Sequence, residues 1–421
     1  MISHRTRRGR RPSLSVFILV ATLAACASCS HSGTPRTEPS APPASPSPAQ
    51  KWIPSDPLDS NDLLWKEFHF RQDADTGQVA VSRDGHAWEA AALGSFLSEQ
   101  RVRFAFDDTA AYVLGTSTRD GLQAVWASRD GLTWDGPSTI EGLLGPSAQL
   151  DDTDLAIVGF AAYGGRLMVA EFQNRRNIIG ENHGLRVWTR RSGSDEWQRQ
   201  PKVPALGTWD AAPDGGLVAL PSGFFILGGD DGQGCDLYSF GPSQIMGRKD
   251  CSFVYRSTDG SSWEDASLVQ DGGRVGIPYA ISQRGDRLVL WGRVPLKKEY
   301  QAPGGPVFST KLTAWYRDAA SAAWQVATVE AGNVPDAGAK PLTQQFVTDV
   351  ATTQQGFVAV GSSGETTGYG ALWTSDDGVA WRKEPTKANG FHKTTSLRLP
   401  DRSAATVCGG GGERRPCWTR R

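Results

Sequence analysis

The sequence predicts an all-β protein, and two features of its pattern support that prediction. Short runs of β-branched and aromatic residues recur along the chain between clusters of Gly, Asp and Ser, as strands separated by turns do. No long run of helix-forming residues with an apolar repeat of 3.6 occurs. The 421 residues include 48 Gly and 15 Trp but only 3 Met, and an all-β chain of this length can form one domain.

Six tryptophans mark a repeat of 46 to 66 residues, and a short apolar strand precedes each of them. They are Trp88, Trp134, Trp197, Trp263, Trp324 and Trp381. A second apolar run lies further upstream in most repeats, for example at 111–115 and 223–229. Three or four antiparallel strands at this period are typical of a β-propeller blade. We therefore expect four-stranded antiparallel blades in a single domain over residues 60–421.

The number of blades depends on how the two ends of this domain meet. The segments 395–399, 404–410 and 416–420 are interpreted as three further strands, which residues 64–70 could join to close the ring. Counting these strands gives seven blades. The distance in sequence from Trp381 round to Trp88 leaves room for only one generous blade, which gives six as the alternative.

Four of the tryptophans close the same pattern, S-x-D-G-x-x-W. The copies are Ser82, Asp84, Gly85, Trp88; Ser128, Asp130, Gly131, Trp134; Ser257, Asp259, Gly260, Trp263; and Ser375, Asp377, Gly378, Trp381. Segments 189–197 and 316–324 hold the same place in degenerate form. The pattern resembles the Asp-box, or BNR, repeat of sialidases and related propellers, whose usual form has one more residue between Ser and Trp. The resemblance covers roughly 75–385 and implies a sialidase-like fold with structural boxes away from the active site.

The chemistry of the box agrees with a structural role. An Asp can accept backbone N–H bonds across a tight turn, and a Gly tolerates a positive φ. A Trp on the next strand can bury a large apolar area between blades. A catalytic group need occur only once, whereas this pattern recurs from blade to blade.

No catalytic residue is predicted. Sialidases need an Arg triad, a Tyr–Glu pair and an Asp acid, yet residues 100–106 do not match the family's R-I-P element. Tyr255 and Tyr316 lie in the strands that lead into the box turns, not on an inner strand. No HExxH, GxSxG or Walker pattern occurs, and segment 228–236 lacks the Asp spacing of a calcium loop, so we expect no cofactor and no metal. The alternative is a glycoside hydrolase-type or other hydrolase or lyase with an unrecognised site in the channel.

Residues 1–25 have the features of a lipoprotein signal peptide. Five Arg precede an apolar stretch at 14–25, which is too short to serve as a permanent membrane span. The following "LAAC" resembles the bacterial lipobox, which implies that Cys26 becomes the first mature residue and carries the lipid, with palmitate among its acyl chains. An ordinary secretory signal with a chance Cys is the alternative, and the general and twin-arginine export routes both stay open.

Residues 26–59 are expected to form a lipid-anchored stalk. Pro and Ser dominate 32–50, where almost no large apolar residue occurs, so the segment favours an extended polyproline conformation. At about 3.1 Å per residue it would hold a domain about 60 Å from the membrane. We therefore expect a monomer attached to the extracytoplasmic face of the cell membrane.

Charge and cysteines fit this location. Residues 1–25 carry five Arg and no acidic residue, so the net charge of −1 becomes −6 without them. An acidic domain of this kind is a poor partner for nucleic acid. In an oxidising compartment, Cys235 is expected to pair with Cys251 and Cys408 with Cys417, since each pair closes a short loop. Cys29 has no assigned role.

A candidate binding face follows from loop lengths. If the boxes lie between the third and fourth strands of each blade, the loops between the second and third strands lie on the opposite face. Three consecutive loops of this kind are long, at 173–184, 230–250 and 294–311, and long loops are often functional. The patch would carry Arg175, Arg176, His183, Asp230, Asp231, Lys297, Lys298 and Tyr300. We expect a non-enzymatic binding or scaffold module for an extracytoplasmic protein, peptide or glycan.

Overall fold

The fold is taken from a computed structural model, in which one compact unit spans Gln50–Arg421. The structure describes residues 52–59, 62–73, 75–97, 102–143, 153–175, 184–191, 193–200, 216–229, 252–270, 273–274, 277–302, 305–318, 323–330, 346–362, 369–385, 390–391, 397–399, 406–409 and 414–420. Every regular element of two or more residues in these ranges is a β-strand. This confirms the all-β expectation.

The strands form seven sheets of four or more strands within the described ranges, numbered here in chain order. Sheet 1 holds β2 (Leu63–Trp65), β3 (Phe68–Gln72), β4 (Val79–Ser82) and β5 (Glu89–Ala90). Sheet 2 holds β6 (Arg103–Phe106), β7 (Ala111–Thr116), β8 (Gln123–Ser128) and β9 (Asp135–Thr139). Sheet 3 holds β10 (Thr153–Tyr163), β11 (Arg166–Arg175), β12 (Gly184–Arg190) and β13 (Trp197–Arg199).

The remaining sheets follow the same order. Sheet 4 holds β14 (Leu217–Leu220), β15 (Gly223–Gly229), β16 (Ser252–Ser257) and β17 (Glu264–Asp265), and a small ribbon of β18 (Val269–Gln270) and β19 (Gly273–Arg274) follows it. Sheet 5 holds β20 (Ile277–Arg284), β21 (Arg287–Ala302), β22 (Gly305–Asp318) and β23 (Gln325–Val326). Sheet 6 holds β25 (Phe346–Thr352), β26 (Phe357–Ser362), β27 (Gly370–Ser375) and β28 (Ala380–Lys383), with β24 (Thr328–Val329) added in parallel to β28.

Sheet 7 joins the two ends of the described chain. It runs β29 (Leu397–Arg398), β30 (Thr406–Gly409), β31 (Arg414–Arg420) and β1 (Trp52–Asp59), and β1 pairs antiparallel with β31. The three C-terminal strands lie where the sequence predicted them. The predicted closing segment was wrong, because residues 64–70 lie in sheet 1 and the closing strand is β1.

The expected boundary between stalk and propeller at residue 59 is corrected by the same observation. Residues 52–59, which include Pro54 and Pro57, were expected to belong to the stalk. Proline lacks the N–H of a ladder hydrogen bond and is tolerated at the edge of a sheet. Because β1 is the outermost strand of sheet 7, its outer edge needs no such donor.

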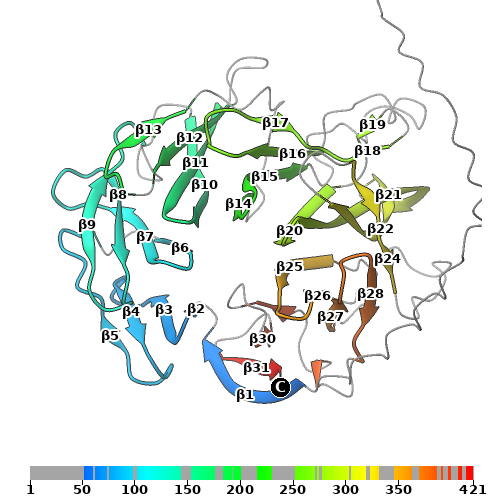
Figure 1. Cartoon of the computed structure of the whole chain (residues 1–421), viewed down its shortest axis with the longest axis horizontal. Helices are drawn as coiled ribbons and strands as arrows, with labels where there is room; N and C mark the ends of the chain where they lie inside the picture. The colour runs from blue at the N-terminus through cyan, green and yellow to red at the C-terminus, as the bar shows by residue number, and fades with distance from the viewer. Residues whose placement is uncertain are drawn as a thin grey trace, which may run out of the picture. The chain divides into compact units, whose positions relative to one another are not determined.

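The sheets are arranged around a common centre, with the first strand of sheets 1 to 6 on the inside (Figure 1). Apolar side chains fill the borders between neighbouring sheets. At one border the ring of Trp291 in sheet 5 lies 4.7 Å from that of Trp381 in sheet 6, centroid to centroid. At another, Leu114 of sheet 2 and Leu167 of sheet 3 belong to one buried cluster. The architecture is a β-propeller of four-stranded antiparallel sheets, and the number of blades in the complete chain stays a prediction.

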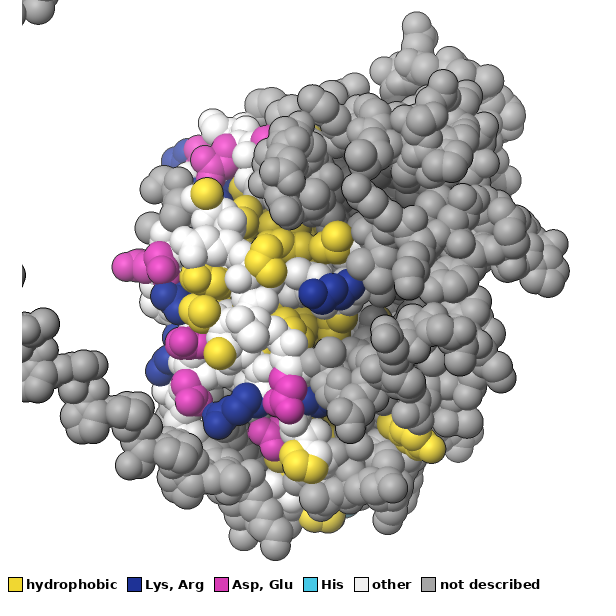
Figure 2. Space-filling view, turned by 90° about the vertical axis from the view of Figure 1, so that its right-hand side faces the viewer, with side chains coloured by type: hydrophobic (Ala, Val, Ile, Leu, Met, Phe, Trp, Pro, Cys, Tyr) yellow, Lys and Arg dark blue, Asp and Glu magenta, His cyan; other side chains and the backbone are white. Residues whose placement is uncertain are grey.

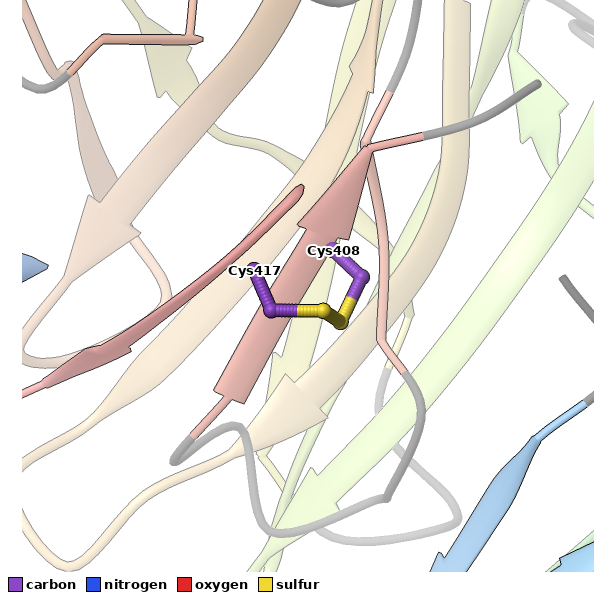
Figure 3. Close-up of a disulfide and its surroundings, with 2 residues drawn as sticks. All are labelled: Cys408 and Cys417. Atoms are coloured by element: carbon purple, nitrogen blue, oxygen red, sulfur yellow. A yellow bond between two sulfur atoms is a disulfide. The ribbon is translucent and has the colours of Figure 1, made fainter. Parts of the chain in front are cut away.

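The expected disulfide between Cys408 and Cys417 is present. The two residues face each other across β30 and β31, with an S–S distance of 2.09 Å (Figure 3). Both sulfur-bearing side chains are buried beside Leu64 of sheet 1. The bond therefore lies in the sheet that joins the two ends of the propeller.

Candidate functional site

The complete Asp boxes form turns held by their own side chains. In the turn after β16, the Ser257 hydroxyl donates to Asp259 Oδ1 at 3.1 Å and accepts from the N–H of Gly260 at 2.7 Å. Asp259 Oδ1 also accepts the N–H groups of Ser261 and Ser262. The carboxylates of Asp84, Asp130 and Asp377 each accept the same three kinds of bond. The box glycines all have a positive φ, between 74° and 82°.

These bonds keep the box carboxylates ionised. The N–H groups of Ala87 and His86, together with the Ser82 hydroxyl, lower the pKa of Asp84 to about 2. The Ser261 hydroxyl is the largest of the groups that lower the pKa of Asp259, also to about 2. A carboxylate that stays ionised because it accepts the N–H groups of its own turn is a poor general acid near neutral pH. The geometry therefore supports a structural interpretation of these residues.

Each complete box from sheet 2 onward presses against the preceding sheet. A methyl group on Gly260 would lie 2.8 Å from Met168 Cε, and one on Gly378 would lie 2.6 Å from Val289 Cγ2. Arginines of the preceding sheet reach the same turns. Arg166 Nη1 donates to the carbonyl of Thr258 at 2.7 Å, and Arg287 Nη1 donates to that of Asp377 at 2.6 Å.

From sheet 2 onward, the tryptophans of the complete boxes also reach the preceding sheet. Trp134 packs with Phe68 and Phe70 of sheet 1, and Trp263 packs against the cluster that Met168 of sheet 3 belongs to. Trp381 is fully buried, whereas the other box tryptophans keep part of their surface exposed. The expected packing between blades is thus present, with unequal depth.

In the two degenerate boxes an arginine stacks on the tryptophan, as Arg71 also does on Trp88 of the first complete box. The guanidinium of Arg190 lies over the ring of Trp197 at 5.5 Å, and that of Arg317 lies over Trp324 at 4.6 Å. The indole N–H groups bond to the preceding sheet, from Trp197 to Ser138 Oγ at 3.1 Å and from Trp324 to the Ala266 carbonyl at 2.8 Å.

The candidate binding face lies on the opposite side of the sheets from the box turns. Strand direction alternates, so the turn from the second to the third strand is at the other end of each sheet from the box. Arg175 is the last residue of β11, and Lys297, Lys298 and Tyr300 lie in β21. The remaining predicted residues of this face, Arg176, His183, Asp230 and Asp231, lie outside the described residues, as do Cys26, Cys235 and Cys251.

One segment of this face is more ordered than a loop. Residues 294–311 were expected to form a long loop, but β21 and β22 continue through most of it. After a register shift between Pro295 and Glu299, the two strands pair as far as Ala302 and Gly305. We call residues 294–302 and 305–311 the sheet 5 ribbon. Residues 297–301 show no alternation of apolar and polar residues that could have indicated a strand.

A buried ion pair at the base of the neighbouring hairpin was not predicted. Glu171 of β11 is fully buried and accepts a hydrogen bond from Arg186, directly across from it on β12. Arg186 also lies over the ring of Trp188 at 5.5 Å. Glu171 sits between apolar neighbours in sequence, which is the signal that could have revealed it.

Other kinds of site were sought in the described part of the chain. There, no group of three or more His, Cys, Asp or Glu is placed to hold a metal ion, and no helix is long and apolar enough to cross a membrane. On the side of the molecule in Figure 2, acidic and basic side chains of described residues alternate, with apolar side chains between them.

Comparisons with known proteins bear on the fold. No family model matches the sequence, and no curated protein does. A solved structure of YCF48 bound to D1 peptide is 16% identical, with a TM-score of 0.45, over 87% of this chain and 96% of that one. A GH93 α-L-arabinofuranosidase of Fusarium graminearum with arabinobiose is 14% identical, with a TM-score of 0.36, over 78% and 94%. The β-propeller domain of the Trilobed protease of Pyrococcus furiosus is 10% identical, with a TM-score of 0.33, over 78% and 98%.

Proposed function

We propose that this chain is a lipid-anchored, extracytoplasmic β-propeller that binds a protein, peptide or glycan and carries no catalytic residues of its own. The face opposite the box turns binds the partner, around the sheet 5 ribbon and the end of the β11–β12 hairpin. The leader supports the location: a basic region, an apolar stretch and "LAAC" precede a Pro-rich stalk in that order.

The observation that carries the binding proposal is the length of the sheet 5 ribbon. β21 and β22 have 16 and 14 residues, whereas β7 and β8 of sheet 2 have six each. Only β21 residues up to Arg293 pair with β20, so the ribbon extends beyond the part that the propeller needs. Such an extension costs conformational entropy. A binding function gives a reason for it, because exposed strand edges can pair with a partner.

Site-specific photocrosslinking in native membranes tests the binding face. A photoreactive amino acid at position 299, in the ribbon, is expected to form a discrete crosslinked product of fixed mass. The matched control places it at position 86, an exposed residue in the first box turn, where no such product is expected. Equal products at both positions, or none at 299, would contradict the proposed face.

The anchor has its own test. Cys26→Ser should leave the leader uncleaved or release the protein into the medium, because the acylated cysteine is gone. Full membrane retention of normally cleaved Cys26→Ser protein would rule out the anchor without affecting the proposed binding face.

A further inference from the structure

Six of the seven sheets carry the same pair of buried apolar side chains, and sheet 1 does not. The two residues face each other on the second and third strands, two residues before the box serine or the residue that takes its place. In sheets 2 to 7 the pair combines an aliphatic residue with an aromatic one, and both are buried. These pairs are Val113–Trp126, Val169–Trp188, Ile226–Tyr255, Leu290–Trp315, Ala359–Trp373 and Val407–Trp418. In sheet 1 the pair is Arg71–Ala80.

The pair lies at the border with the preceding sheet. Trp188 of sheet 3, for example, belongs to the same buried cluster as Leu114 of sheet 2. Sheet 1 follows this rule. Leu64 lies on the same face of sheet 1 as Arg71, and it packs against the disulfide of sheet 7. The pair that lacks an aromatic side chain therefore lies at the border of sheets 7 and 1.

A second position of sheet 1 is polar at the same border. Sheets 2 to 6 hold a buried apolar residue on the second strand, directly across from the box serine or its replacement. These residues are Ala111, Leu167, Phe224, Leu288 and Phe357. Sheet 1 holds His69 there, and the imidazole is partly exposed. Arg71, two residues further on, lies over the ring of Trp88 at 3.9 Å.

Sheet 7 also turns its polar side toward this border. Val407 and Trp418 pack with side chains of sheet 6, so Thr406, Thr419 and the disulfide lie on the side that faces sheet 1. Within the described ranges, the apolar cluster of this border consists of the two cysteines and Leu64. Each of the other six borders has a cluster that buries at least one aromatic ring. Because buried apolar area stabilises a contact roughly in proportion, this border is the easiest to separate.

The strand that closes the ring does not depend on this border. Trp52 of β1 is 4% exposed and packs in one cluster with Val358 and Leu372 of sheet 6. β1 also pairs with β31 from Trp52 to Asp59. Sheet 1 can therefore move away from sheet 7 while β1 keeps its contacts, and the chain between Asp59 and Leu63 still joins the two sheets.

We propose that the propeller opens at the border of sheets 7 and 1 without unfolding, and that reduction of the Cys408–Cys417 disulfide makes this opening easier. The bond ties β30 to β31, the strand on which β1 closes the ring. Both cysteines are 2% exposed, so a reductant reaches them when sheet 1 has moved away. This opening involves neither the sheet 5 ribbon nor the anchor, so it does not rest on the proposed function.

The reductant is a dithiol. Its thiolate attacks one sulfur of the protein disulfide, and the bond between the two cysteines breaks as a mixed disulfide forms. The second thiol of the reductant then displaces the other cysteine and closes the reductant into its own disulfide. Two electrons and two protons have passed to the protein, where they remain as two thiols.

The rate at which dithiothreitol reduces this bond tests the opening. The full chain in detergent is reduced at several urea concentrations below the unfolding transition. The new thiols are alkylated and assigned by peptide mass spectrometry, which separates them from the other cysteines. We expect a rate that hardly changes with urea, because separating one border exposes little surface. A rate that rises with urea as steeply as the equilibrium constant for global unfolding would overturn the proposal.

Two variants at the border should change the rate in opposite directions. Arg71→Val with Ala80→Trp introduces the pair that sheets 2 and 3 carry, and it should slow reduction about fivefold because it adds apolar packing against sheet 7. Leu64→Ala uncovers the sulfurs and should speed reduction about threefold. Val169→Ala is the matched control, since Val169 holds the position of Arg71 in sheet 3. It lowers the overall stability and should leave the rate at low urea unchanged.

The variants also separate the proposed opening from other ways of exposing the bond. An unchanged rate in Leu64→Ala and in a folded Arg71→Val/Ala80→Trp variant would show that the disulfide is reached without separation of sheets 7 and 1, which contradicts the proposal. So would an equal change of the rate in Val169→Ala.

Discussion

The complete and the degenerate Asp boxes are two solutions to the same architectural task. After β16 and β27, a Ser and an Asp satisfy the turn's own N–H groups, and the Gly lets the turn touch the preceding sheet. After β12 and β22, an arginine stacks on the tryptophan, whose indole bonds to the preceding sheet. The tryptophan is common to both. This comparison indicates that contact between sheets is the essential part of the motif and that the carboxylate network is one way of fixing it.

The largest expected effect concerns that shared tryptophan. Trp381→Ala should lower the free energy of unfolding by about 3–5 kcal/mol, because the side chain is 2% exposed and packs on Trp291. Trp324→Ala should cost about 2 kcal/mol, since its ring is only partly buried and loses one hydrogen bond. Urea unfolding followed by near-ultraviolet circular dichroism measures both. A greater loss for Trp324→Ala would reverse the comparison.

Two glycine substitutions compare the cost of backbone strain alone with the cost of strain plus a clash between sheets. Gly378→Ala in a complete box should cost about 2–4 kcal/mol, because the new methyl group meets Val289 and φ is +79°. Gly193→Ala in a degenerate box should cost about 1 kcal/mol, since φ is +75° but nothing lies within 4 Å of the methyl group. Equal losses in the same unfolding assay would mean that the complete box does not press on its neighbour.

Sequence alone predicts the repeat because its signals are local. The four complete boxes place turns and tryptophans correctly, and apolar runs mark the inner strands. It misses β1 because Pro54 and Pro57 resemble the stalk, and only the position of β1 at the outer edge of sheet 7 makes them acceptable. The pairing of β24 with β28 is likewise a tertiary feature of two short segments.

The candidate sites are less predictable because they depend on contacts between sheets. Trp324 and Ala266 are 58 residues apart in sequence, and the hydrogen bond between them follows only from the order of the sheets. The sheet 5 ribbon is a different case. The sequence identifies its residues as a long insertion, but the length of an insertion does not reveal the register in which its strands pair. The placement of Arg176, His183, Asp230 and Asp231 on the binding face stays a prediction.

Acidification should reduce the contribution of the complete box turns to the free energy of unfolding. The pKa values of Asp84 and Asp259 are about 2 in the folded protein, below the ordinary value of 3.8. Their contribution to stability is therefore complete above pH 3.8 and is lost as the pH falls toward 2. Asp259→Asn should make the decline in unfolding free energy between pH 4 and pH 2 shallower, since one such group is gone. An unchanged slope would contradict the role of Asp259 in the turn.

The smallest effect is expected in a degenerate box. Arg190→Met should change the free energy of unfolding by less than about 1 kcal/mol, because the lost stacking on Trp197 is offset by removing a half-buried cation. A loss above about 2 kcal/mol would mean that the arginine is an essential part of the degenerate box.

Amide hydrogen exchange in Asp377→Ala tests most directly whether the complete box is a turn held by its carboxylate. In the wild-type protein the N–H groups of Val379 and Ala380 donate to Asp377 Oδ1 at 2.8 and 3.2 Å. We predict that Asp377→Ala speeds exchange at these two amides at least tenfold, while the amides of β26 keep their protection. Unchanged exchange at Val379 and Ala380 in a folded Asp377→Ala variant would contradict the account.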